Sequence, residues 1–168
     1  ELGYELYIPT EQAVHVYERL LAAGAPLGVR HAGLKALASL RLEKAYRDYG
    51  HDIDNTDTVL EVGLGFAVDL GKPGGFLGKD AVLAQKAAGP LRKRLVQLRV
   101  LDPAPLLFHA EVVWRDDRPV GYVRAGSYGH TLGGAVGLAM VDAGGAPVDA
   151  AYLSSGAWSI DIAGTRYP

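Results

Sequence analysis

The stretch Val112–Arg124, VVWRDDRPVGYVR, predicts a β-hairpin and decides the fold class of the second half of the chain. Apolar and β-branched residues fill its two flanks, and the polar turn from Asp116 to Pro119 separates them. Two such runs joined by a short polar turn are typical of antiparallel strands. We therefore expect residues 112–115 to pair with residues 120–124.

Strand-like segments continue on both sides of this hairpin, and those over 96–100 and 158–162 alternate apolar with polar residues. Further strands are predicted over 96–100, 135–141, 150–153 and 158–162, and the last of these places Trp158 toward the interior. Glycine and proline turns join these short strands, with no helical period between them. The pattern predicts a small closed antiparallel barrel. We assign this barrel to residues 91–168.

Residues 1–90 have a different, mostly helical pattern. A short strand is predicted over 6–8, followed by a helix from Thr10, as N-cap, to Gly24. A second helix is predicted from residue 33 to a C-cap at Gly50, and a short third helix over 79–88 follows a glycine-rich segment. The complete chain is therefore predicted to be α+β, with a helix-containing region followed by the barrel.

The composition excludes several classes of function. The 168 residues carry a formal charge of −2 and no cysteine, which rules out disulfides, thiolate zinc sites and thiol nucleophiles. Such a charge gives no general attraction to nucleic acid or to an anionic membrane. No signal peptide or membrane span is recognisable, so we expect a cytoplasmic protein. The chain begins without Met inside a strand-like alternation, and we expect it to be a fragment.

Local motifs for metal or phosphate binding are incomplete. GHDIDNTD resembles the start of a calcium loop, but Asp57 stands where glycine is needed and Gly63 where a bidentate glutamate is needed. A solvated loop after the second helix is the simpler interpretation. GGFLGKD lacks the first glycine and the final Ser or Thr of a phosphate loop. The five histidines are predicted to be scattered, and no metal site is expected.

The order of longer segments resembles the aminomethyltransferase (glycine cleavage T-protein) family. The similarity covers nearly the whole chain, and its final segments are most similar to the C-terminal region of the FAD-dependent sarcosine and dimethylglycine dehydrogenases. The segments that carry it are GYEL (3–6), AGLKALASLRLEKAYRDYGHDI (32–53), LEVGLGFAVDL (60–70), GFLGKDAV (75–82), RLVQL (94–98), AEVVWRDDRPVGYVRAGSYGHTLGGAVGLAMV (110–141) and SSGAWSIDIAGTRYP (154–168).

The resemblance implies a folate-dependent one-carbon module. In such enzymes a flavin domain oxidises an N-methylamine, and the T-protein-like region presents tetrahydrofolate to capture the one-carbon unit. Glu5 matches the family's glutamate that binds the pterin ring, and a carboxylate suits that edge because it accepts two parallel N–H bonds. A solvent-facing Glu5 is the structural alternative. Residues 1–90 would then be a truncated folate-binding region, with FAD held only by upstream domains of the same polypeptide.

Two departures limit what the resemblance implies. The family's folate-associated arginine aligns with Leu37, and the catalytic aspartate lies upstream, so no catalytic residue is expected in this chain. Arg41, Glu43 and Lys44 are predicted to brace their helix through neighbouring charges. Two other functions stay open: a non-catalytic folate-binding or assembly domain, and part of a tetrahydrofolate-dependent aminomethyltransferase without flavin. The amine substrate is not predicted, and neither nucleic acid nor a membrane is expected as partner.

Overall fold

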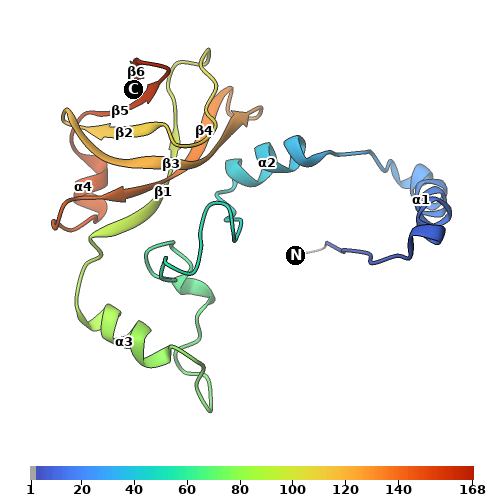
Figure 1. Ribbon diagram of the computed structural model, residues 1–168, viewed down its shortest axis with the longest axis horizontal. Helices are drawn as coiled ribbons and strands as arrows, with labels where there is room; N and C mark the ends of the chain where they lie inside the picture. Colours follow the sequence, from blue (N-terminus) through green and yellow to red (C-terminus); the bar gives the residue numbers. More distant parts are fainter. Residues whose placement is uncertain (1–2) are drawn as a thin grey trace. The chain divides into compact units, whose positions relative to one another are not determined.

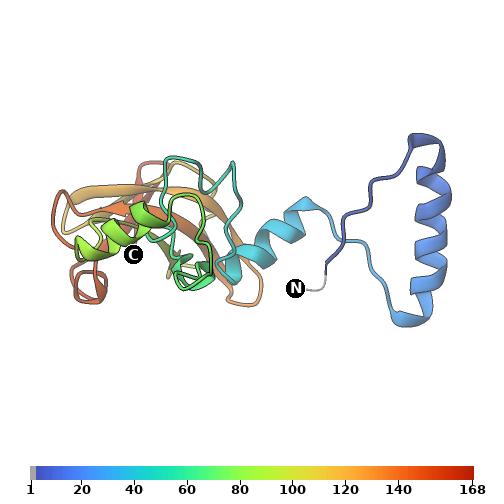
Figure 2. The ribbon, with the colours of Figure 1, turned by 90° about the horizontal axis from the view of Figure 1, so that it is seen from below.

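The computed structural model describes residues 3–168, which fall into two compact units. The first unit ends at Leu34, and the second spans Lys35–Pro168 (Figures 1 and 2). No helix in this described part of the chain is both long and apolar enough to cross a membrane. Each unit has its own secondary structure and is described separately below.

The first unit contains an extended segment and one long helix. Helix α1 (Thr10–Gly24) confirms the predicted helix, although its N-cap is Pro9 and not Thr10. A 3-10 turn, η1 (Ala25–Leu27), follows it, and Gly28 ends the turn at a φ of 73°. The strand predicted over 6–8 is wrong: these residues belong to no strand, because an alternating run forms a strand only where a ladder partner exists.

Helix α2 (Leu34–Glu43) is shorter than the helix predicted to reach Gly50. Ala45 has a φ of 56°, which no residue inside an α-helix adopts. The following residues form turns, a 3-10 turn η2 (Gly65–Ala67) and helix α3 (Lys79–Ala87). The prediction of α3 is confirmed, and the prediction of helix over residues 44–49 is wrong.

A six-stranded antiparallel sheet forms the rest of the second unit, in the order β1-β4-β3-β2-β5-β6 (Figure 1). The predicted hairpin is confirmed, with Val112 opposite Tyr122. A bond of 2.9 Å from the Leu101 N–H to the Pro168 oxygen joins residues that follow the two outer strands. The strands are β1 (Lys93–Arg99), β2 (Val112–Arg115), β3 (Arg118–Gly129), β4 (Gly134–Asp142), β5 (Trp158–Ile162) and β6 (Thr165–Tyr167).

The strand predicted over 150–153 is instead a short helix, α4 (Ala150–Ser154). The Asp149 carboxylate accepts a 2.8 Å hydrogen bond from the Tyr152 N–H and thereby caps the first turn. Strand β6 was not predicted, because three residues are too few to show an alternation. Both differences lie near the C-terminus of the chain.

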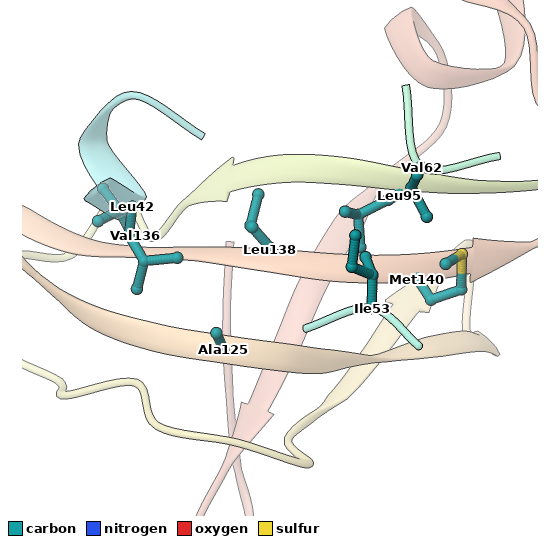
Figure 3. Packing of buried hydrophobic residues seen from close by; sticks show 8 residues of the cluster. All are labelled: Leu42, Ile53, Val62, Leu95, Ala125, Val136, Leu138 and Met140. Carbon is teal, nitrogen blue, oxygen red and sulfur yellow. The ribbon is translucent and has the colours of Figure 1, made fainter. Parts of the chain in front are cut away.

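Strand β4 is buried on both faces and separates two apolar clusters. Ala135 and Ala139 belong to the cluster on one face, which also holds Val123 and Ile160. The other cluster lies where α2 and the following turns cover β1, β3 and β4 (Figure 3). It contains Leu42, Ile53, Val62, Leu95, Ala125, Val136, Leu138 and Met140. Each large side chain buried here contributes about 1.5–3 kcal/mol to folding.

Candidate functional site

Glu5, the predicted folate-binding residue, lies in the extended segment that precedes α1. Its side chain is exposed, and its Oε2 accepts a 2.9 Å hydrogen bond from the Tyr7 hydroxyl. Tyr4 and Tyr7 are 90% and 91% exposed on either side of it. The segment therefore presents one carboxylate between two accessible phenol rings, a combination that can hydrogen-bond and stack against a planar heterocycle.

Helix α1 is held to the end of the first unit by an aromatic contact. The Tyr17 hydroxyl lies 2.8 Å from His31 Nε2, and the two rings stack with centroids 5.8 Å apart. Both residues belong to the first unit, so this contact holds the segment after η1 against helix α1. Neither residue was singled out by the sequence, because a tyrosine and a histidine fourteen positions apart form no recognisable motif.

Arg41 on α2 forms a buried ion pair with Asp52, in place of the predicted pairing within the helix. Its Nη2 donates to Asp52 Oδ1 at 3.0 Å, and its Nη1 donates to the other carboxylate oxygen. Glu43 instead accepts a 2.7 Å bond from the Thr131 N–H. The predicted stabilisation of α2 by charge pairs within the helix is therefore wrong. Arg41 and Glu43 instead bond to residues outside the helix. Leu37 is 57% exposed and offers no polar group.

The prediction of a solvated loop after the second helix is wrong at Asp52, because the Asp52 side chain is fully buried. Burial alone would raise the pKa of this carboxyl group, but hydrogen bonds from Arg41, from His51 and from the Asp48 N–H outweigh burial and lower the pKa. His51 Nδ1 lies 2.8 Å from Asp52 Oδ1. The His51 ring also contacts the His109 ring, with centroids 5.9 Å apart, so these two histidines are not scattered.

Asp57 forms a second buried ionic contact beside the first. Its Oδ1 accepts a 2.9 Å bond from Lys93 Nζ on β1, and its Oδ2 lies 3.5 Å from Arg124 Nη1 on β3. The side chain of Asp57 is fully buried. Within residues 3–168, no group of three or more His, Cys, Asp or Glu side chains is arranged to hold a metal ion. These contacts join residues far apart in sequence, so no local motif could reveal them.

Several cavities lie at the surface of the second unit, and two of them adjoin the sheet. A groove of about 460 Å³ runs between α2 and the end of the β3–β4 hairpin, and Lys35, Glu43 and His130 supply its charged or titratable side chains. Another cavity, of about 280 Å³, lies on the barrel side between β1 and β5. Its lining includes Val96, Leu98, Val113, Leu153, Trp158 and Ile160.

Two family models match successive parts of the chain. Residues 1–72 match the "GCVT N-terminal domain", and residues 93–168 match the "Glycine cleavage T-protein C-terminal barrel domain". A crystal structure of the glycine cleavage system aminomethyltransferase T from Bartonella henselae has the same fold, with a TM-score of 0.75 at 23% identity over 95% of this chain and 42% of that chain.

Curated relatives extend the similarity to two kinds of oxidising enzyme. The chain is 48% identical over 84% of its length to a 4-methylaminobutanoate oxidase (formaldehyde-forming) from Paenarthrobacter nicotinovorans. It is 39% identical over 99% of its length to the mitochondrial sarcosine dehydrogenase of Homo sapiens. An aminomethyltransferase from Caldanaerobacter subterraneus is 40% identical over 84% of the chain.

The chain is much shorter than these relatives. It spans 17% of the oxidase, 18% of the dehydrogenase and 37% of the aminomethyltransferase. The two family models between them leave out only residues 73–92, the segment that contains α3. The chain belongs to the glycine cleavage T-protein (GCVT) family and includes its C-terminal barrel domain.

Proposed function

We propose that the chain is the C-terminal part of a folate-linked, FAD-dependent N-methylamine dehydrogenase of the sarcosine or dimethylglycine type. The observation that carries the proposal is the similarity to the human sarcosine dehydrogenase, which extends over 99% of this chain. The 48% identity to an oxidase of another methylamine supports the same class. In this proposal the chain helps to present tetrahydrofolate for capture of the one-carbon unit. The absence of cysteine fits a reducing compartment, and the location that we propose is the cytoplasm.

Glu5 is the residue that we assign to the folate. Its exposed carboxylate can accept N–H bonds from the aminopyrimidinone edge of a pterin, and the flanking Tyr4 and Tyr7 offer aromatic surface. Residues 1–90 would belong to the folate-binding region and residues 91–168 to the barrel. The flavin would supply the two-electron oxidation of the N-methyl group when bound, and we assign it to upstream domains of the same polypeptide.

Substitution of Glu5 in a longer parent protein tests this assignment. Glu5→Gln should weaken tetrahydrofolate binding about 10- to 100-fold, since one charge-assisted hydrogen bond contributes about 1.5–3 kcal/mol. Reduction of the flavin by the amine should stay unchanged, because the substitution affects the folate site alone. Glu11→Gln is the matched control, since Glu11 is an exposed glutamate in the first turn of α1. Equal folate affinity in all three proteins would return Glu5 to the role of a solvated residue.

Part of a tetrahydrofolate-dependent aminomethyltransferase without flavin is the second candidate. The 40% identity to an aminomethyltransferase over 84% of the chain favours it. The two candidates differ in the polypeptide before residue 1: a nucleotide-binding Gly-x-Gly motif after a strand there would favour the dehydrogenase. The third candidate is a folate-binding or assembly domain without catalysis. Folate binding by a parent protein that turns over no amine would support this candidate.

A further inference from the structure

Strand β1 has one edge that pairs with no other strand in the part of the chain that the structure describes. The sheet begins with β1 and ends with β6, and β1 pairs with β4 alone. Just after β1, the Val100 N–H donates to the Ala135 oxygen on β4 at 2.9 Å. Because successive residues of a strand turn their backbone groups to opposite edges, Gln97 and Arg99 turn their N–H and C=O groups to the free edge.

Hydrogen bonds occupy both ends of this edge and leave its middle unpaired. The Leu95 N–H donates at 2.8 Å to a carbonyl oxygen in the turns that follow α2. The Leu101 N–H donates at 2.9 Å to the Pro168 oxygen. Between these two bonds, the outward backbone groups of Gln97 and Arg99 have no backbone partner among the described residues. Unpaired groups along a strand edge are the groups with which an added strand pairs.

The cavity of about 280 Å³ between β1 and β5 lies along this unpaired stretch. Gln97 and Arg99 line it together with the apolar residues Val96 and Leu98. Val96 and Leu98 pack against the apolar cluster that contains Ile160, yet they are only partly buried. The cavity therefore has both the backbone groups that an added strand would pair with and apolar side chains that it would cover.

The sheet determines the direction in which such a strand would run. Every pair of neighbouring strands is antiparallel, so the outer strands β1 and β6 run in opposite directions. The bond between Leu101 and Pro168 is the first bond of an antiparallel ladder between these two strands. A strand that continues β6 in its own direction would pass Arg99 and then Gln97.

Strand β5 borders the other side of the same path. The ladder between β5 and β6 ends at the pair of Ile160 with Tyr167. Trp158 lies beyond this pair on β5, and it also lines the cavity. A strand that continues β6 would therefore lie between β5 and β1, along the cavity.

We propose that the free edge of β1 receives one further extended strand, the residues that follow Pro168 in a longer parent polypeptide, and that this strand completes the barrel. The second and fourth of these residues would exchange backbone hydrogen bonds with Arg99 and Gln97, so neither should be proline. The first and third would point to the interior, as Tyr167 does, and should be apolar. The proposal does not depend on folate binding at Glu5, because it rests on strands of the second unit alone.

Extension of the chain by five residues tests the proposal. The sequence Ala-Thr-Val-Thr-Val is added after Pro168, and amide hydrogen exchange is followed by ¹⁵N–¹H correlations. The amides of Gln97 and Arg99 should exchange at least about tenfold more slowly than in the unextended chain, because each gains a hydrogen bond. The amides of Val96 and Leu98 are the internal reference, since they face β4 in both proteins.

A second extension, Thr-Val-Thr-Val-Thr, is the matched control. It reverses the alternation and turns its threonines toward the cavity, so it should not slow the exchange of Gln97 and Arg99. Equal exchange of these two amides in all three proteins would overturn the proposal. Amides that are as protected in the unextended chain as those of Val96 and Leu98 would also overturn it, because the edge would not be free. Protection that rises with the concentration of the unextended chain would assign the edge to a second copy instead.

Discussion

At the scale of single residues, the buried carboxylate of Asp52 determines how stability responds to acid. Its pKa is lower in the folded state, because the bonds from Arg41, His51 and the Asp48 N–H outweigh the effect of burial. Ionised Asp52 therefore favours folding above pH of about 4, and this contribution is lost as the pH falls through the folded-state pKa.

Asp52→Asn should destabilise the second unit by about 3–5 kcal/mol at pH 7, because it leaves Arg41 buried beside an uncharged partner. The deficit relative to wild type should shrink at pH 3, because the stability that the lowered pKa of Asp52 provides declines once the pH falls below the unfolded-state pKa of about 3.9. Urea unfolding at both pH values measures this. Asp117→Asn is the control, since that side chain is 92% exposed in its own pair with Arg166. A deficit that does not change with pH would contradict the assigned ion pair.

Gly126 marks a place where backbone packs against backbone. A Cβ at this position would lie 2.6 Å from the Leu107 carbonyl carbon and 2.7 Å from the Phe108 nitrogen. Because these are main-chain atoms, Gly126→Ala should cost at least about 1–3 kcal/mol in the free energy of unfolding. Gly33→Ala, where nothing lies within 4 Å, should change it by less than about 0.5 kcal/mol. Thermal and urea unfolding measure the stability of the two variants. Equal stability would show that the backbone at Leu107 and Phe108 can move away from the added methyl group.

At the scale of elements, the accuracy of sequence-based prediction depended on where each signal lay. The hairpin was predictable because residues 112–124 contain both strands and their turn. The early end of α2 was not, because the chain leaves the helix at Ala45, a residue other than glycine with a φ of 56°, while the apolar positions at 45, 46 and 49 still kept a helical period. Helix α4 did carry a local signal, the capping Asp149, but the apolar run over 150–153 was interpreted as a strand.

Strand β5 shows the limit of predicting the depth of burial from alternation. Trp158 was predicted to point into the barrel. It is only partly buried, and it packs against the apolar cluster that contains Val123 and Ile160. Its Nε1 donates to the Ser155 oxygen at 3.0 Å, and its ring meets the Tyr152 ring at 5.8 Å. An indole N–H needs a partner, which keeps one edge of the ring near the surface.

Trp158→Ala should therefore cost about 2–3 kcal/mol, less than the 3–5 kcal/mol of a fully buried tryptophan. Calorimetric melting of the variant measures the loss. The control is Phe66→Ala, because Phe66 is 85% exposed and its truncation should have little effect. Equal melting temperatures for the two variants would show that Trp158 contributes no packing energy to β5.

At the scale of the whole molecule, the two units differ in how much apolar surface they bury. All the residues of both apolar clusters belong to the second unit. The first unit exposes large apolar side chains, among them Tyr4, Tyr7 and Leu27 at 85–91%. Deletion of residues 1–34 should thus change the melting temperature of the remaining chain by less than about 4 °C, the shift that corresponds to about 1 kcal/mol. A larger decrease would show that the first unit stabilises the second.

The same exposure determines what the chain should do alone with tetrahydrofolate. Enclosed ligand sites bury most of the ligand, yet Glu5, Tyr4 and Tyr7 lie exposed on an extended segment. If upstream domains supply the rest of the site, as we propose, the chain should fold but bind tetrahydrofolate only weakly, with a Kd above about 100 µM.

Calorimetric titration of the chain beside a longer parent protein measures this difference. The parent should bind tetrahydrofolate at least about 100-fold more tightly, because enclosure adds contacts and excludes water. The chain should also be colourless and inactive toward sarcosine and dimethylglycine, since we assign the flavin to upstream domains. Binding by the chain alone at micromolar or lower Kd would contradict a site divided between the chain and upstream domains. It would favour an autonomous folate-binding domain, and Glu5→Gln in the chain itself would then show whether Glu5 belongs to that site.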